Sequence, residues 1–493
     1  MTNAVPALRV RRLNQQSKRG DGEFVLYWMT ASRRLTFNFS LQRAVELAKD
    51  MNRPLLILEA LRIDYRWASR RLHAFVIQGM RDNQQMAVQA GHCYVPYVEL
   101  IVGSGSGLIE TLARRASAIV TDDFPCFFLP RMIQAVARRV PVQMEAVDTN
   151  GLMPMRAADS VFPTAYAFRR FLQKTLTPHL MEFPAPSPLS DSTIPRLISG
   201  PECFSNRWLP ATPELLCGET AALSALPLDQ TVGEAIMPGG PSAGRSCLKQ
   251  FLKYRLNRYA EARNQPDEDV ASGLSPYLHF GHISVHEVFS ELASLEGWSI
   301  QDLADPKTTR GSRTGWWGMS ESAESFLDEL VTWRELGFNM CWQRPDHDQY
   351  ESLPGWAQET LAKHASDPRS SIYTLEELQT ARTHDDLWNA AQTQLLTEGR
   401  MHNYLRMLWG KKILEWSESP RAALHVMIEL NNRYAVDGRD PNSYSGIFWV
   451  LGRYDRAWGP ERAIFGKIRY MTSANTAKKL RLTKYLEKYV PQF

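Results

Sequence analysis

The chain has 493 residues, 44% of them apolar and 22% charged, and a formal net charge of +4. That length supports two or three domains, each with its own core. No stretch approaches the roughly 18 to 20 consecutive apolar residues of a membrane span, and the basic N-terminus lacks the apolar core of a secretory signal. Six cysteines without a CxxC pair favour reduced thiols and argue against a zinc site. We therefore expect a protein of the cytoplasm, or of the nucleus in a eukaryote, with no membrane partner.

The first 150 residues alternate strand-like and helix-like patterns. Apolar, β-rich runs occupy residues 24–28, 54–58, 97–102, 118–121 and 142–147. Amphipathic stretches such as residues 70–89 and 130–139 separate them. This alternation predicts an α/β domain over residues 1–180, with a Rossmann-like parallel sheet covered by helices.

A glycine-serine run, GSGSG, occupies residues 103–107, after the third predicted strand. Such a turn can bind phosphate through backbone N–H groups at the start of a helix. Leu108 stands where the third glycine of the GxGxxG pattern would be. An ordinary helix start therefore explains the run better than a phosphate cradle.

Composition changes between residues 184 and 241, where ten prolines occur in 58 residues. So many prolines disfavour helices and predict an interdomain linker over residues 181–243. The pattern from there to the C-terminus predicts an all-helical domain over residues 244–493. Within it, residues 297–325 are loop-like, and we assign them no role.

Positive charge is concentrated at the C-terminus. Residues 451–493 carry ten Lys or Arg against three acidic residues, a net charge of +7, so the rest of the chain sums to −3. Tyr470, Tyr485 and Tyr489 lie within this basic segment. Basic residues interleaved with aromatic ones are typical of contact with a nucleic-acid backbone. A solvated basic helix would have the same composition.

Three tryptophans near the C-terminus have a spacing that suits electron transfer. Trp409 and Trp416 are seven residues apart, so on a helix they share a face and lie about 10 Å apart along its axis. Trp388 lies one predicted helix earlier. Indole is easily oxidised by one electron, so such a row can carry an electron hole. Taken alone, the spacing favours ordinary core packing.

Longer motifs around these tryptophans carry a family resemblance. GRMHNYLRMLWGKKILEW, LNNRYAVDGRDPNSYSGIFW and FGKIRYM closely resemble the C-terminal motifs of class II cyclobutane pyrimidine dimer photolyases. These are flavoproteins that use light to split UV-induced dimers in DNA. YAEARNQP and GLSPYLHFGHIS extend the resemblance upstream, and VRRLN and VLYWMTASRRL extend it more faintly to the N-terminus. It covers most of the chain and is densest from Arg245 onward.

The resemblance implies that the helical domain binds FAD. The residues that it assigns to the cofactor are Tyr259, Ala271, Ser272, Gly273, Leu274, Ser275, Asn403, Arg406, Asn431, Asp437 and Asp440. Among them, Asn431 is expected beside the redox-active ring nitrogen, and Arg406 and Asp437 are expected to form a buried ion pair. For DGRDPN, a solvent-exposed turn is the alternative.

UV-damaged DNA is the partner that the resemblance implies, and the dimer would have to be flipped out of the duplex, as it is by photolyases. The assigned lesion and strand contacts are Arg263, Asn264, Glu329, Trp333, Met407, Trp449, Arg456 and Arg469. Trp333 and Trp449 are expected to flank the dimer, although Trp333 departs from members that carry arginine there. The catalytic group is expected to be Glu329, Asn431, Arg406 and Asp437. Packing or surface roles are the alternative for each.

The tryptophan row acquires a role from the same resemblance. Trp409, Trp388 and Trp416, in that order, are expected to reduce resting flavin, a step that precedes repair. No metal is expected: His282 and His286 are four residues apart and could share a helix face, but no third ligand is positioned nearby and the HExxH order is absent. A monomer is expected.

The predicted function is light-driven repair of cyclobutane pyrimidine dimers by electron transfer from photoexcited reduced FAD. One alternative is a cryptochrome-type blue-light photosensor without repair, and another is a nucleotide-binding α/β protein with a helical interaction domain. Whether the protein also binds a second, antenna chromophore of the deazaflavin or folate type stays open. Asn38-Phe39 stands where the family resemblance leads us to expect Asn-Trp, and nothing local identifies a pigment.

Overall fold

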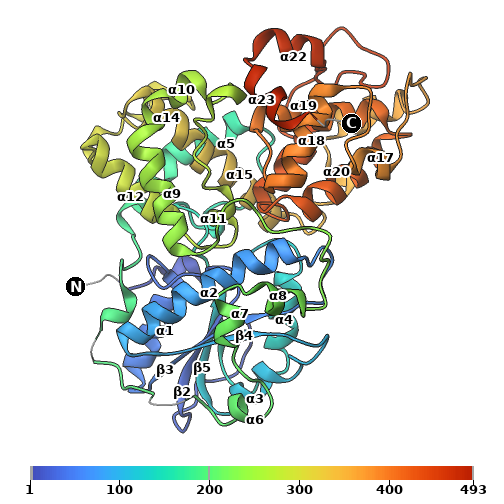
Figure 1. Cartoon of the computed structure of the whole chain (residues 1–493). Coiled ribbons are helices and arrows are strands. Elements are labelled where there is room, and N and C mark those ends of the chain that lie inside the picture. The colour runs from blue at the N-terminus through green and yellow to red at the C-terminus, as the bar shows by residue number, and fades with distance from the viewer. Residues whose placement is uncertain (1–3, 192, 198–199, 491–493) are drawn as a thin grey trace.

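The computed structural model describes residues 4–191, 193–197 and 200–490. Figure 1 shows an α/β part, formed by the N-terminal third of the chain, stacked against a larger helical part. The predicted fold class, an α/β domain with a parallel sheet followed by a helical domain, is confirmed. None of the described helices is long and apolar enough to cross a lipid bilayer.

The sheet has six strands in the order β1-β6-β5-β2-β3-β4, and only β1 runs antiparallel to its neighbour. Its strands are β1 (Val10–Arg12), β2 (Phe24–Met29), β3 (Leu55–Leu61), β4 (Cys93–Val98), β5 (Ala116–Asp122) and β6 (Met144–Val147). The helices around it are α1 (Phe39–Asp50), α2 (Arg70–Ala90), α3 (Leu108–Ala113) and α4 (Leu129–Ala137).

Alternating side chains of β2 build both cores of the α/β part. Phe24, Leu26 and Trp28 pack with α3 and α4 on one face of the sheet. Val25, Tyr27 and Met29 pack with α1 on the other. Both faces are covered, as expected for a parallel sheet with helical crossovers.

One predicted strand is displaced. The sequence places a strand over residues 97–102, but β4 ends at Val98, and Leu100, Ile101 and Val102 are exposed in the loop that follows. The carboxylate of Glu99 accepts hydrogen bonds from the backbone N–H groups of Ile63 (3.2 Å) and Gly105 (2.9 Å). These bonds turn the chain out of the sheet. The apolar composition of residues 100–102 gives no sign of this turn.

The proline-rich segment contains more helix than its composition indicated. It forms the one-turn helices α6 (Cys203–Asn206), α7 (Pro213–Leu216) and α8 (Thr220–Ser224). Leu215, Leu216 and Leu223 pack with apolar residues of α2. The proline at the first position of α7 is compatible with a helix start, because that position needs no N–H donor.

The helical part is built from helices of very different length. They are α5 (Ala165–Thr175), α9 (Pro241–Tyr254), α10 (Tyr259–Ala262), α11 (Ser275–His279), α12 (Val285–Glu296), α13 (Pro306–Thr309), α14 (Glu321–Leu327), α15 (Arg334–Gln343), α16 (Gly355–Lys363), α17 (Leu375–Gln379), α18 (Asp386–Glu398), α19 (Asn403–Trp416), α20 (Pro420–Tyr434), α21 (Pro441–Val450), α22 (Ser473–Lys479) and α23 (Thr483–Tyr489). A π-helical turn, η8 (Asp328–Trp333), joins α14 to α15. Short 3-10 turns occur at Ala7–Arg9, Met155–Ala157, Thr177–Met181, Pro188–Ser190, Leu256–Arg258, Pro266–Glu268, Ile300–Asp302 and Tyr350–Ser352.

Two features of this part differ from simple expectation. Although residues 165–175 fall within the predicted α/β domain, α5 packs in the helical core, and Arg169 pairs with Asp328 on η8 at 2.8 Å. The predicted loop over residues 297–325 is largely irregular but not detached, because Trp316 and Trp317 are buried in the same core.

Helix α2 connects the two parts (Figure 1). The guanidinium of Arg71 donates to the backbone carbonyls of Leu395 (3.1 Å), Leu396 (2.6 Å) and Tyr434 (2.8 Å) in the helical part. Those carbonyls lie near the ends of α18 and α20, where a helix leaves acceptors unpaired. The α/β part is therefore held against the two helices that flank α19.

Candidate active site

A large cavity of about 760 Å³ lies in the helical part, with walls from α9, α10, α11, α19 and α23. Eleven of the residues predicted for cofactor or lesion line it. They are Tyr259, Arg263, Asn264, Ala271, Ser272, Gly273, Ser275, Glu329, Asn403, Arg406 and Asp437. The structure thus brings together residues that lie up to 178 positions apart in the sequence.

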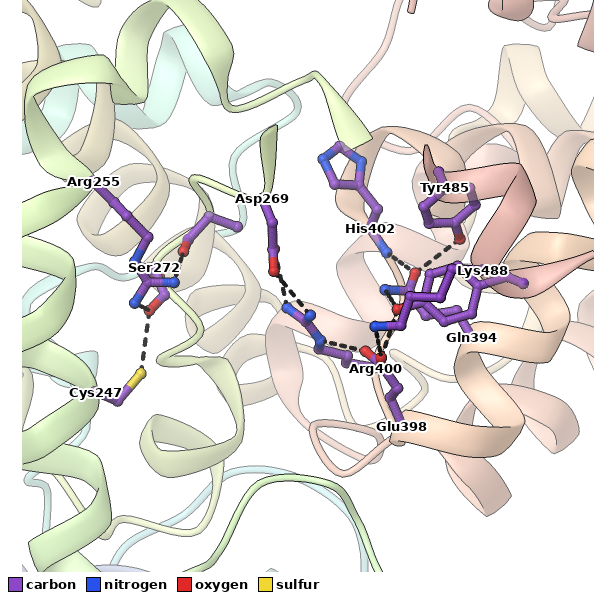
Figure 2. Close-up of polar contacts among 12 residues, drawn as sticks. Cys247, Arg255, Asp269, Ser272, Gln394, Glu398, Arg400, His402, Tyr485 and Lys488 are labelled. Atoms are coloured by element: carbon purple, nitrogen blue, oxygen red, sulfur yellow. Dashed lines mark hydrogen bonds and ion pairs between the residues drawn. The ribbon is translucent and has the colours of Figure 1, made fainter. Parts of the chain in front are cut away.

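Arg255 fixes the turn that forms one wall. Its guanidinium donates to the carbonyl oxygens of Ala271 (2.9 Å) and Ser272 (3.4 Å), as Figure 2 shows in part, and the thiol of Cys247 also donates to Ser272. No carboxylate pairs with Arg255 among the described residues, so its positive charge stays uncompensated at the cavity wall.

Asp437 joins the turn to α19. Its carboxylate accepts from the hydroxyl of Ser275 at 2.7 Å and pairs with Arg406 at 3.2 Å. Burial alone would raise the pKa of Asp437, but the charge of Arg406 and these hydrogen bonds bring the pKa below its ordinary value. The predicted ion pair is therefore formed, although both side chains are partly exposed rather than buried, and it holds a carboxylate on the wall in its charged form.

The opposite wall is a network that centres on Arg400 (Figure 2). Arg400 makes two contacts with Asp269, at 3.1 and 3.2 Å, and one with the buried carboxylate of Glu398 at 2.9 Å. Glu398 also accepts from Lys488 (2.7 Å) and Tyr489 (2.5 Å) on α23. These donors outweigh the effect of burial and lower the pKa of Glu398 to about 2.

Helix α23 completes this wall, and the sequence did not predict that role. The hydroxyl of Tyr485 donates to Gln394 at 2.9 Å, while the carboxylate of Asp267 accepts from the backbone N–H of Tyr485 at 2.8 Å. Lys484, Tyr485, Lys488 and Tyr489 all line the cavity. In sequence they were visible only as part of a basic, tyrosine-containing tail.

Three predicted cofactor residues do not reach the cavity wall. Leu274 is buried in the apolar core. The amide of Asn431 donates to Ser443 at 2.7 Å, and Asp440 caps α21 and accepts from His279 at 3.1 Å. Asn442, which the sequence did not single out, lies on the wall instead.

Glu329 and Trp333 lie on the π-helical turn η8. Such turns often occur at functional sites because they re-aim side chains within a helix. The carboxylate of Glu329 pairs with Arg263, whose guanidinium lies 5.7 Å from the ring centre of Tyr259. Burial raises the pKa of Glu329 despite the charge of Arg263. Trp333 is half-buried and does not line the cavity.

Three predicted lesion contacts, Trp449, Arg456 and Arg469, form an aromatic-basic cluster with Lys411 and Trp458. The ring centre of Trp449 lies 4.9 Å from Lys411 and 5.4 Å from Arg469. Trp458, which the sequence reading missed, lies 4.1 Å from Arg469 and 4.4 Å from Arg456. This alternation of cations and rings is typical of single-stranded nucleic-acid contacts.

Met407, the remaining predicted lesion contact, is half-buried on α19 beside Arg406. It does not line the large cavity.

The three predicted electron-transfer tryptophans are buried between α18 and α19. The indole N–H of Trp388 donates to the carbonyl of Trp409 at 3.1 Å, and that of Trp409 donates to Gln392 at 2.9 Å. The rings of Trp388 and Trp416 lie edge to face, 5.7 Å between centres. Trp416 is 1% exposed and packs against Tyr373 and the exposed His384.

A second cavity, of about 430 Å³, lies between the carboxyl edge of the sheet and the helical part. Its walls include Trp28, Arg33 and Tyr65 from the α/β part, and His279 and Arg439 from the helical part. The GSGSG run, interpreted above as an ordinary helix start, precedes α3 and also contributes to this wall.

One short helix touches both cavities. Ser275, at the start of α11, lines the large cavity, and His279, at its end, lines the second. Four residues of helix rise by about 6 Å. The two cavities therefore approach each other to within about one helical turn.

A parallel α/β part, a helical part with a large polar cavity and a buried row of indoles beside it together define the photolyase type of architecture. The chain is 32% identical over 489 residues to a deoxyribodipyrimidine photo-lyase of Methanothermobacter thermautotrophicus, covering 98% of both chains. It is 35% identical to a deoxyribodipyrimidine photo-lyase of Oryza sativa, over 94% of this chain and 86% of that one. The chain belongs to the deoxyribodipyrimidine photo-lyase family.

A solved structure supports the fold separately. A bacterial class III photolyase from Agrobacterium tumefaciens superimposes with a TM-score of 0.66 over 95% of this chain and 87% of that chain, at 18% identity. No family model matches the sequence. The prediction of a photolyase rather than a photosensor is confirmed at the level of the family.

Proposed function

We propose that this protein repairs cyclobutane pyrimidine dimers in UV-damaged DNA by light-driven electron transfer, with FAD in the large cavity. The observation that carries this proposal is the cavity itself: it has the size of a ligand site and gathers eleven of the predicted residues. When bound, reduced FAD supplies the excited electron that splits the dimer and that afterwards returns.

The residues of the wall fit an anionic dinucleotide. Arg255 holds an uncompensated charge beside the turn of Ser272 and Gly273, and Lys484 contributes positive charge from α23. A pyrophosphate needs such donors. Across the cavity, Arg406 and Asp437 offer a cation and a charged acceptor in fixed positions, which suits the polar edge of a flavin ring.

Among the residues expected beside the ring, Asn442 is better placed than Asn431. Asn442 lies on the wall, whereas the amide of Asn431 is occupied by Ser443. We propose that Asn442 faces the flavin and that Asn431 supports the loop between α20 and α21.

Lesion contact is proposed for Glu329, Arg263 and Asn264 at the cavity and for Trp449 with its cationic neighbours. A neutral carboxyl at Glu329 can donate a hydrogen bond to a pyrimidine carbonyl, and its raised pKa favours that form. The rings of Trp449 and Trp333 offer stacking faces. The basic neighbours Arg456 and Arg469 would contact phosphates, and we propose that the protein acts as a monomer in the cytoplasm or nucleus.

Trp409, Trp388 and Trp416 are proposed to reduce resting flavin in that order. Trp409 lies three residues after Arg406 on α19, and its backbone carbonyl is joined to the indole of Trp388. The direct contact between Trp388 and Trp416 supplies the next step. We also propose that the protein belongs to class II, an assignment supported by the C-terminal motifs GRMHNYLRMLWGKKILEW, LNNRYAVDGRDPNSYSGIFW and FGKIRYM.

For the second cavity we propose an antenna chromophore. Its wall combines the aromatic faces of Trp28, Tyr65, Phe127 and Phe128 with polar groups, which suits a planar heteroaromatic ring. Its approach to the large cavity through α11 would place such a pigment close to the flavin.

The deciding experiment is light-dependent repair by the purified, reduced protein. DNA with cyclobutane dimers is incubated under near-UV or blue light and in darkness, and dimer content is measured. We expect dimers to disappear only in the light. Equal dimer content in both samples, with flavin bound, would contradict repair and favour a photosensor.

A further inference from the structure

A cluster of two thiols and an imidazole lies outside both proposed binding sites, where the α/β part meets the helical part. Cys126 is in the loop after β5, Cys341 is on α15, and His347 follows α15. All three are buried, and their ligand atoms lie within 4.8 Å of one another. We propose that Cys126, Cys341 and His347 bind a thiophilic metal ion, Zn²⁺ or Cu⁺, that joins the two parts of the chain.

The distances suit direct coordination. Bond lengths of about 2.3 Å to sulfur and about 2.0 Å to nitrogen place these two ligand atoms about 3.5 Å apart at a tetrahedral metal. The observed separation between Cys126 Sγ and His347 Nε2 is 3.6 Å. Cys126 and His347 can therefore reach one ion with little movement of the backbone, and the ligand atom of Cys341 lies within 4.8 Å of both.

The hydrogen bonds of His347 select the tautomer that a metal needs. Its Nδ1 lies 3.1 Å from the carbonyl oxygen of Arg344, and a carbonyl oxygen can only accept. Nδ1 therefore carries a proton, which leaves Nε2, 3.6 Å from the sulfur of Cys126, as the ring nitrogen that can bind a metal. An imidazole oriented through a backbone carbonyl is the usual support of a metal-binding histidine.

Buried cysteines are more often inert packing residues, so the imidazole is what distinguishes this cluster. The thiol of Cys126 donates to the carbonyl of Arg439 at 3.4 Å, and Arg453 donates to the carbonyl of His347 at 2.9 Å. Metal binding would form two bonds to sulfur and one to nitrogen and would release the two thiol protons to solvent. In this apolar core, Zn²⁺ would compensate the charge of both thiolates and Cu⁺ the charge of one.

A site with three protein ligands suits either of two kinds of metal ion. Zn²⁺ would complete a tetrahedron with a water molecule, whereas Cu⁺ is satisfied by soft ligands alone. Either ion would connect the loop after β5 to α15 and so stabilise the contact between the two parts of the chain.

The test uses the full-length reduced protein under anaerobic conditions. It is dialysed against Zn²⁺, and in a separate arm against Cu⁺, and bound metal is measured by mass spectrometry. We expect about one ion per chain in the wild type and in Cys217→Ser, a control that removes an exposed thiol. Cys126→Ser, Cys341→Ser and His347→Ala should each weaken binding by at least about tenfold.

A second measurement keeps the test independent of how well the variants fold. Co²⁺ added to the wild type should give a thiolate-to-metal absorption band, which Zn²⁺ should displace. A wild type that takes up no metal in either arm and shows no such band would overturn the proposal. So would the finding of a Cys126–Cys341 disulfide in the protein as isolated.

Discussion

The helical part contains tryptophans in two different environments. Trp388, Trp409 and Trp416 are at most 2% exposed and pack among apolar side chains. Trp333 and Trp449 are half-buried, and the ring of Trp449 lies between Lys411 and Arg469. The ammonium of Lys412 lies 5.2 Å from the ring centre of Trp416, so a neighbouring cation does not distinguish the two groups. Burial separates the tryptophans predicted for electron transfer from those predicted for stacking.

The strongest test of this comparison removes the first indole of the buried row. Trp409→Phe keeps most of the ring volume but is much harder to oxidise. We expect normal folding and flavin content, near-complete loss of photoreduction from the oxidised state, and repair largely retained after chemical reduction. Absorbance changes of the flavin under blue light measure the effect.

The matched control is Trp356→Phe, which alters another indole that packs against the same core. Its photoreduction should equal that of the wild type. Wild-type photoreduction in Trp409→Phe would instead show that the three buried indoles are core residues or that another route bypasses them.

The second test concerns the half-buried indoles. Trp449→Ala should weaken binding to dimer-containing DNA by about 1 to 3 kcal/mol, the usual contribution of a base-aromatic contact. Affinity for undamaged DNA should scarcely change, and Trp449→Phe should retain most of the affinity. Titrations with both DNAs check this, and an equal loss on both would place Trp449 in the core rather than against the lesion.

Sequence reasoning succeeded where a periodic pattern reports directly on structure. Alternating strand and helix patterns gave the α/β part, and the seven-residue spacing of Trp409 and Trp416 gave one face of α19. The apolar run after Val98 misled because exposed loops also contain such runs.

Contacts between distant segments have no such local pattern. Lys488 meets Glu398 across 90 residues, and Cys126 meets His347 across 221. Neither pair changes any local periodicity. Asn442 was missed for a related reason: DGRDPN offers several polar side chains, and only the geometry of the loop decides which one faces the cavity.

The third test examines the cation beneath Trp449. Lys411 is fully buried, its ammonium donates to the carbonyl of Val450 at 2.6 Å, and burial lowers its pKa to about 7. Between about pH 7 and about pH 10 the unfolded chain binds a proton that the folded chain lacks, so wild-type stability should rise with pH. The slope is at most about 1.4 kcal/mol per pH unit.

Lys411→Met should flatten this dependence, and Lys363→Met, at an exposed position, should not. Denaturant unfolding at several pH values compares the three proteins. A wild-type free energy of unfolding that is constant over this range would mean that Lys411 keeps its ordinary pKa, and that Trp449 faces a fully charged ammonium.

The smallest expected effect concerns Glu329, which shares the η8 turn with Trp333 and is proposed to donate to the lesion. Because burial raises its pKa, the neutral carboxyl persists to higher pH than in a free glutamate, and its hydrogen bond should be lost as pH rises through that pKa. Wild-type affinity for dimer-containing DNA should therefore fall by about 0.5 to 1.5 kcal/mol, the net contribution of one hydrogen bond. Glu329→Gln keeps a donor that does not titrate, so its affinity should be high and independent of pH, whereas Glu329→Ala should be weak at every pH. If Glu329→Gln follows the same pH profile as the wild type, another group titrates, and Glu329 acts only by positioning Arg263.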